Sequence, residues 1–338
     1  MDSVTWKLEE NTLFIAGKGV IPKGDGRDKM STNIPWSEHK DNINYIVIEP
    51  DISEISECAF AFNKNLEKVI IPNTVTHIGG AAFNNCFNLK SIHIPNSVVK
   101  IDNGPFAGCG SLEQIIVDSE NKMYCSENNI LYNKDKSCLI QYFTGSKSTN
   151  FTIPIHVDTI GYGAFHNSEN LKSITIHESV KLIEDCAFGG CDLNEIINLS
   201  KEPQEINCLH FLGVDKSKCV LYVNTDVVRK YRMSYYWCNF RKISDLCGNV
   251  VDEQDWSFRD SFKDDKRIQW MINSGCPTLE DFIREERENV KFGIPPMRPN
   301  WIEAMAVWDV QPKIVETRKT GWLDDETSRS RYLWDPLA

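Results

Sequence analysis

The chain has 338 residues, of which 41% are hydrophobic and 25% charged, and its formal net charge at pH 7 is -11. These proportions are ordinary for a folded chain and exclude disorder throughout. Because Lys and Arg form no clustered stripe, nucleic acid and anionic membrane are excluded as expected partners, and no apolar run is long enough to cross a bilayer.

Residues 1–42 are predicted to form an irregular first coil. Leu13 and Ile15 have the alternation of a strand, and a loop rich in Gly and Pro follows them. The first coil of a stacked repeat must shield an apolar end, and Trp6 and Trp36 are the side chains suited to cover it.

One pattern of apolar residues occurs three times between Ile48 and Ile116. Equivalent positions of the pattern are always as far apart in the sequence as Ile48 and Ile71. A fixed period of this length predicts a solenoid, because no single unit can bury its apolar side without stacking on its neighbours. Each unit contains an alternating strand that ends near a Pro, followed by turns. The recurring columns are Ile48, Ile71 and Ile94; Ile52, Val75 and Val98; Ile55, Ile78 and Ile101; Phe60, Phe83 and Phe106; and Leu66, Leu89 and Leu112.

The unit from Ile71 to Ile92, I-P-x-x-V-x-x-I-x-x-x-A-F-x-x-C-x-x-L-x-x-I, resembles the BspA-like class of leucine-rich repeats. The resemblance covers about residues 5–243. It implies a leucine-rich-repeat solenoid: a curved parallel β-sheet, with turns and short helices on the other face. It also implies roles in binding surface proteins and in adhesion.

The register breaks between residues 118 and 150, where a hairpin inserted around the polar segment 133–137 is predicted. The period then resumes, with Phe165 and Phe188 separated by the same step as Phe60 and Phe83, and one residue is lost after Cys191. Residues 203–243 are predicted to form a closing cap over the last coil. The predicted solenoid therefore spans residues 1–243.

Residues 246–338 lose the period and resemble no family. Their six Trp argue against simple disorder, since disordered segments are poor in aromatics. We predict a small, mainly α C-terminal module with helices near 264–273, from Thr278, and over 301–308.

The 12 Cys include no C-x-x-C pair, so the strongest zinc signature is missing. Cys86, Cys109 and Cys191 each follow the repeat Phe by three residues, and this position favours a small buried hydrophobe. All seven His lie between His39 and His210, and no nucleophile recurs beside them. The sequence therefore predicts no catalytic residue, no metal and no cofactor.

The outward face of the repeat strands is the candidate binding surface. Its mixture of apolar, hydroxyl and imidazole groups with few charges suits a protein or peptide partner. The candidate residues are Tyr45, Val47, Lys68, Ile70, Ser91, His93, Gln114, Ile116, Thr152, Thr175 and His177.

The favoured hypothesis is a non-enzymatic scaffold that recognises a protein through the exposed face of the repeat sheet, through the C-terminal module, or through both. One alternative is an effector or toxin whose repeats select the target while residues 246–338 act on it, with Cys276 as the candidate nucleophile. Another is a surface adhesion protein whose export signal has been removed. In a third, the C-terminal region is structural and serves as an oligomerisation or capping device. The segment from Met1 to Lys7 has no secretory pattern, so the expected location is the cytoplasm unless a signal was removed.

Overall fold

The computed structural model describes residues 3–24, 26, 34–207, 209–216, 218–234, 236–240 and 242–248. The chain divides into two units, Met1–Val251 and Asp252–Ala338. The helices predicted at 264–273, from Thr278 and over 301–308 lie outside the described residues, and so does Cys276. The described architecture is that of the first unit.

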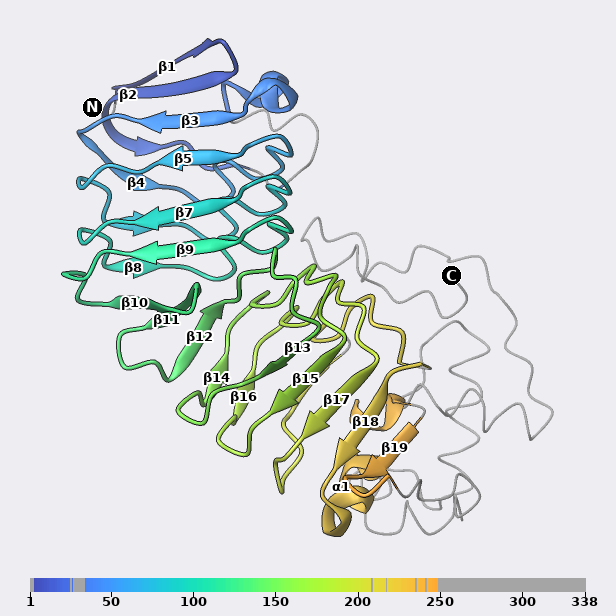
Figure 1. The fold of residues 1–338 in the computed structure, drawn as a ribbon. Helices are drawn as coiled ribbons and strands as arrows, with labels where there is room; N and C mark the ends of the chain where they lie inside the picture. Colours follow the sequence, from blue (N-terminus) through green and yellow to red (C-terminus); the bar gives the residue numbers. More distant parts are fainter. Residues whose placement is uncertain are drawn as a thin grey trace, which may run out of the picture. The chain divides into compact units, whose positions relative to one another are not determined.

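Successive coils stack so that each adds one strand to a front sheet, and several also add a short strand to a back sheet (Figure 1). The first stack has a front sheet made of the start of β2 (Thr12–Ile21), β3 (Tyr45–Ile48), β5 (Lys68–Ile70), β7 (Ser91–Ile94) and β9 (Gln114–Val117). The end of β2 begins its back sheet, which continues through β4 (Ile52–Ile55), β6 (His77–Ile78) and β8 (Lys100–Ile101). All of these neighbours pair in parallel, and only β1 (Ser3–Glu9) is antiparallel, beside β2.

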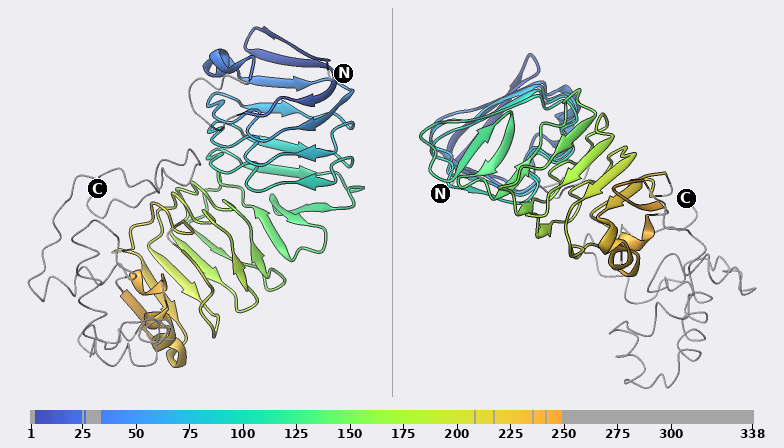
Figure 2. Two further views of the ribbon diagram at one scale, coloured as in Figure 1. Left: turned by 180° about the vertical axis from the view of Figure 1, so that it is seen from behind. Right: turned by 60° about the horizontal axis from the view of Figure 1, so that its bottom comes forward.

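A second stack repeats this arrangement after the insertion, as Figure 2 also shows. Its front sheet consists of β13 (Asn150–Thr152), β15 (Ser173–Ile176), β17 (Glu195–Asn198), β18 (Val220–Val223) and β19 (Lys242–Asp245). Its back sheet contains β12 (Cys138–Gln141), β14 (Thr159–Ile160) and β16 (Leu182–Ile183). Ile174 pairs with Ile196, one position short of the regular repeat step, which confirms the deletion predicted after Cys191.

The parallel-sheet solenoid predicted from the period is confirmed, with one difference of detail. In the described repeat coils, turns and the short back-sheet strands take the place of the short helices expected there. The helical elements of the described part lie near its two ends: η1 (Ser37–Asn42), η2 (Thr225–Val227), α1 (Val228–Met233) and η3 (Trp237–Asn239).

A column of stacked aromatic rings forms the centre of the core. Phe83 lies between Phe60 and Phe106, with ring centroids 5.4 and 5.7 Å away. Trp36 begins the column, stacked on Phe60 at 5.6 Å, and Trp6 packs against Trp36 as the expected cover. The second stack continues the same way through Tyr142, Phe165, Phe188 and Phe211, closed by Trp237 and Phe240.

Most coils turn the Phe corner through two residues with left-handed backbone conformation. In one coil these are Gly104 (φ 56°) and Gly108 (φ 77°), two residues before and two after Phe106. The same conformation recurs at Cys58, Phe62, Ala81, Asn85, Gly163, Asn167, Cys186, Gly190 and Gly213. Most side chains disfavour it by about 1–2 kcal/mol, which explains the frequent Gly and Asn there.

Replacing Gly108 by Ala is expected to lower the free energy of unfolding by about 1–2 kcal/mol or more. The left-handed backbone disfavours a Cβ, and this Cβ would also meet the side-chain amide of Asn85. Gly110 is the matched control, because a Cβ there has open space around it. Urea denaturation of both variants tests the idea; equal losses in the two would contradict it.

The inserted segment, residues 118–150, lies between the two stacks and separates two hydrophobic cores. β10 (Tyr124–Glu127) pairs antiparallel with β11 (Ile130–Asn133), and β11 pairs antiparallel with β12. Ile130 and Tyr132 belong to the core of the second stack, whereas Leu131 belongs to that of the first. Both faces of β11 are therefore buried, an unusual situation for a hairpin strand.

Side chains of the same segment complete the open edges of the first stack. The backbone N–H of Ile101 donates to the Tyr124 hydroxyl at 2.7 Å, and that of Val117 donates to Ser126 Oγ at 3.1 Å. The buried Asn121 donates from Nδ2 to the carbonyls of Pro95 and Val98. These bonds satisfy strand ends that the next regular coil would otherwise pair.

Candidate protein-binding surface

Strand alternation decides which side chains of the front sheets point outward. Ile46, Val69, Ile92 and Ile115 face the core and are buried. Their neighbours along the strands point away from the core, since successive side chains of a strand alternate between faces. The first eight candidates occupy these outward positions on the first front sheet: Tyr45, Val47, Lys68, Ile70, Ser91, His93, Gln114 and Ile116.

The strand register arranges these residues in two rows that cross the strands. In the flank row, Tyr45 lies beside Thr12 and Lys68, and Ser91 lies beside Lys68 and Gln114. The second row, called here the central row, contains Phe14, Val47, Ile70, His93 and Ile116, one residue from each of five neighbouring strands.

Four of the five residues in the central row are apolar, and two of these four are exposed to solvent. Ile70 is 50% exposed and Ile116 is 42% exposed, and Tyr45 of the flank row is 44% exposed. Sequence reasoning missed Phe14, although its position between the inward residues Leu13 and Ile15 indicates that its side chain points outward. It is half-buried, and the Lys7 amine lies 4.9 Å from its ring centroid.

His93 is the one polar member of the central row. Its Nε2 lies 2.8 Å from a carboxylate oxygen of Asp118, and the other oxygen of that carboxylate accepts the backbone N–H of Asn96. Asp118 is thereby held in place and in turn orients the imidazole. The arrangement positions His93 as a recognition group, and no Ser, Thr or Cys side chain in the described part of the chain hydrogen-bonds to its ring.

The second front sheet presents a more polar row at the equivalent positions. Thr152 pairs with Thr175, and the row continues through Ile197, Tyr222 and Ser244. His177 lies just beyond the end of β15, where its Nδ1 contacts the Ser179 hydroxyl at 3.2 Å. Thr152, Thr175 and His177 are therefore set apart from the other eight candidates, on a different sheet.

A shallow hollow of about 460 Å³ borders this row of the second front sheet. Within it, the Ser173 hydroxyl donates to Glu195 Oε1 at 2.6 Å, and the Lys172 amine at its border lies 2.5 Å from the carboxylate of Asp192, outside the lining. Its lining consists of Thr149, Asn150, Lys172, Ser173, Asn194 and Glu195. The internal pairing of these polar groups leaves the hollow with little capacity to hold a charged ligand.

The buried thiols have a structural role. The Sγ–H groups of Cys86, Cys109 and Cys191 donate to the carbonyls of Phe60, Phe83 and Phe165 at 3.0–3.2 Å. Burial raises the pKa of Cys86 and of Cys191 to about 12, so these thiols stay protonated. A thiol is nucleophilic only as its thiolate, so these three positions do not supply a nucleophile.

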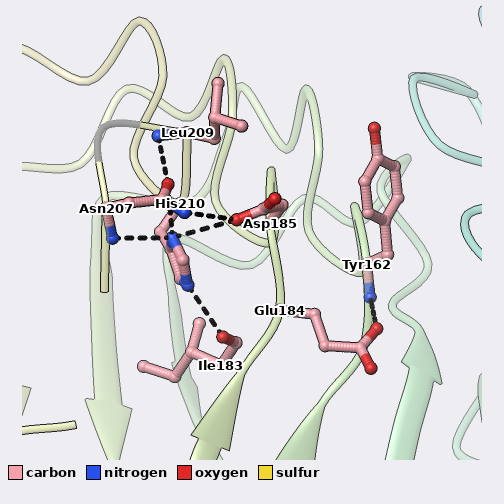
Figure 3. A network of polar contacts seen from close by, with 7 residues as sticks. All are labelled: Tyr162, Ile183, Glu184, Asp185, Asn207, Leu209 and His210. Atoms are coloured by element: carbon pink, nitrogen blue, oxygen red, sulfur yellow. Dashed lines mark hydrogen bonds and ion pairs between the residues drawn. The ribbon is translucent and has the colours of Figure 1, made fainter. Parts of the chain in front are cut away.

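A polar network around His210 stabilises the corner of a late coil (Figure 3). His210 Nε2 donates to the carbonyl of Ile183 at 2.8 Å, and its Nδ1 accepts the backbone N–H of Asn207 at 3.1 Å. Asn207 in turn donates from Nδ2 to Asp185. Burial lowers the pKa of His210 below its ordinary value of 6.5, which favours the neutral imidazole.

This lowered pKa predicts that stability falls in mild acid. The unfolded chain takes up the proton first, so the contribution of His210 is complete above about pH 6.5 and is lost as the pH falls through the folded-state pKa. The variant His210→Gln is expected to lose less stability than wild type between about pH 7.5 and 5.5, as measured by urea denaturation. An unchanged pH dependence of stability in the variant would contradict this role of His210. Burial also lowers the pKa of His166, so a weaker pH dependence is expected to remain in the variant.

Within the described ranges, no group of three or more His, Cys, Asp or Glu side chains is arranged to hold a metal ion. The helices of the same part are all too short or too polar to span a membrane.

Comparison with known proteins identifies the repeat. A family model described as the BspA type leucine rich repeat region matches in six copies over residues 37–136 and 136–263. A search of curated proteins finds no significant match.

Solved structures of similar proteins include three from bacteria. A leucine-rich repeat protein from Eubacterium ventriosum is 28% identical, with 71% of this chain and 75% of that chain covered and a TM-score of 0.42. A leucine rich cell surface protein from Faecalibacterium prausnitzii is 19% identical, with 72% and 93% covered and a TM-score of 0.43. The pneumococcal vaccine antigen PcpA is 15% identical, with 72% and 83% covered and a TM-score of 0.43.

Proposed function

The chain belongs to the BspA-type leucine-rich repeat family, and on that premise we propose that it is a non-enzymatic scaffold that binds a protein through its front sheets. The observation that carries the proposal is the exposed apolar central row of the first front sheet. Exposed apolar side chains that gather on one face, bordered by polar side chains, are typical of a protein-interaction surface.

The scaffold beneath this row favours recognition. Parallel pairing sets the spacing of the outward side chains, and the stacked Phe column beneath the strands holds the coils in register. A partner that binds such a preorganised surface does not have to order it first, so less binding free energy is lost.

Site-specific photo-cross-linking in the full chain tests the proposal. A benzophenone side chain replaces Tyr45 on the first front sheet, Tyr222 on the second front sheet, or Leu182 on the back sheet of the second stack as a control. We expect a discrete protein adduct from Tyr45 or Tyr222 and none from Leu182, which is 48% exposed. Adducts from Leu182 alone, or from none of the three, would contradict binding at the front.

The proposal takes two forms that differ in compartment: an adaptor in the cytoplasm, or an adhesion protein at the cell surface. Protease treatment of intact cells, followed by immunoblotting of the full chain, distinguishes them. Digestion in intact cells supports the surface form, and protection until lysis supports the adaptor.

A further inference from the structure

The central row of the first front sheet has a regular spacing. It contributes one side chain from each of five adjacent strands, and neighbouring strands lie about 4.8 Å apart. Phe14 and Ile116, at its two ends, are therefore separated by four steps, or about 19 Å. A partner lying along this row must repeat its own apolar side chains at a similar interval.

An α-helix meets this requirement better than an extended chain. Helix residues i, i+4, i+7, i+11 and i+14 lie on one face and span about 21 Å. Side chains on one face of an extended peptide recur about every 6.6 Å, and four steps then span about 26 Å. The helix therefore stays in register with all five positions, whereas the extended peptide loses it after two.

Charged side chains border the row on both sides. Lys68 is exposed on the flank where the strands begin, and no ion-pair partner is recorded for it in the described part of the chain. Its neighbour Lys90 is paired with Glu67 at 2.7 Å. On the other flank, Glu49 is exposed just after β3. The surface is therefore complementary to an acidic residue on one border of an apolar stripe and a basic residue on the other.

The second front sheet does not offer the same surface. Its equivalent row contains two Thr, Ile197, Tyr222 and a buried Ser244. Among the described residues, no large apolar side chain on the strands of this sheet is as exposed as Ile70 or Ile116. Two sheets with the same backbone therefore differ in what they can bind.

We propose that the partner of the first front sheet is an amphipathic α-helix of about four turns. Its apolar stripe lies along Phe14, Val47, Ile70, His93 and Ile116, with an acidic side chain opposite Lys68 and a basic one opposite Glu49. This inference rests on the proposed function and specifies the chemistry of the partner.

Selection from two peptide libraries tests the inference with the full chain. One library of peptides about fifteen residues long places variable apolar residues at positions 1, 5, 8, 12 and 15 on a helix-forming background of Ala, Glu, Lys and Gln. The other contains the same residues in an order without a stripe. We expect enrichment only from the first library, with Glu recurring on the border of the stripe that faces Lys68 and Lys recurring on the border that faces Glu49.

Matched variants then locate the binding site. Ile70→Thr is expected to weaken the selected peptides about tenfold or more, whereas Ile197→Thr at the equivalent position of the second stack changes binding less than about twofold. Thr keeps the strand preference of Ile, and circular dichroism checks the fold of both variants. Lys68→Glu is expected to weaken binding, and a peptide whose border acid is changed to Lys is expected to recover it.

The inference is overturned if both libraries enrich equally, if neither enriches, or if Ile197→Thr weakens binding as much as Ile70→Thr. Self-association of the wild-type chain that Ile70→Thr abolishes, measured by light scattering, would instead make a second copy the occupant and also overturn it. These failures are distinct from failure of the proposed function. Adducts at Tyr45 or Tyr222 would keep the scaffold role and reject only the helical partner.

Discussion

Replacing Phe83 by Ala is expected to lower the free energy of unfolding by about 3–5 kcal/mol. The Phe83 ring is fully buried and is stacked on both sides, against Phe60 and Phe106. The substitution removes the buried apolar area of one ring and leaves a cavity between two others. In a repeat protein the loss also weakens both coil interfaces, because each coil is stabilised mainly by its neighbours.

Phe87→Ala is the matched control for this substitution. Phe87 belongs to the same coil but is 39% exposed, so its loss is expected to cost less than about 1 kcal/mol. Urea denaturation followed by circular dichroism measures both variants. Similar losses for Phe83→Ala and Phe87→Ala would mean that the ring column is not the main source of stability.

Replacing Leu131 by Ala is expected to cost about 2–5 kcal/mol and to affect the first stack most. Leu131 is fully buried in the core of the first stack, although its strand continues into the back sheet of the second. Its loss opens the end of the first stack just where Tyr124 and Ser126 complete the strand edges. The variant is therefore expected to unfold in two steps in urea, the first stack at the lower concentration.

Ile130→Ala provides the reciprocal test, since Ile130 belongs to the core of the second stack. Hydrogen exchange distinguishes the two variants. Leu131→Ala is expected to reduce protection mainly in β7 and β9, and Ile130→Ala mainly in β13 and β15. If both variants reduce protection equally in both stacks, the strand β11 does not separate two cores.

Much of the fold was predictable because every repeat unit buries side chains at the same positions, so the same apolar pattern recurs several times in the sequence. The Phe column, the inward Ile and Val columns and the deletion after Cys191 follow from spacing alone, and the pairing register agrees with each of them. The candidate surface was predictable for the same reason. Once the inward residues of a strand are known, the residues between them must point outward.

Other features required the backbone itself. Ile197 and Tyr222 were missed because the lost residue shifts their numbering, and only the pairing of Ile174 with Ile196 shows which residues continue the row. Cys58 and Cys186 each lie two residues before a repeat Phe, a position in the sequence that suggests a small buried residue. Their positive φ shows instead that they form the corner of the coil, a backbone property that Cys does not signal in a sequence.

The sequence by itself determined that the chain is a stack of like coils, because one repeat unit cannot bury its apolar side except against another unit. The tertiary structure alone decided that β11 lies between two cores and that the row of the second front sheet continues through Ile197 and Tyr222. The physical reason is that these features depend on which strands pair within the insertion and after the deletion, where the regular spacing that sets the register elsewhere is interrupted.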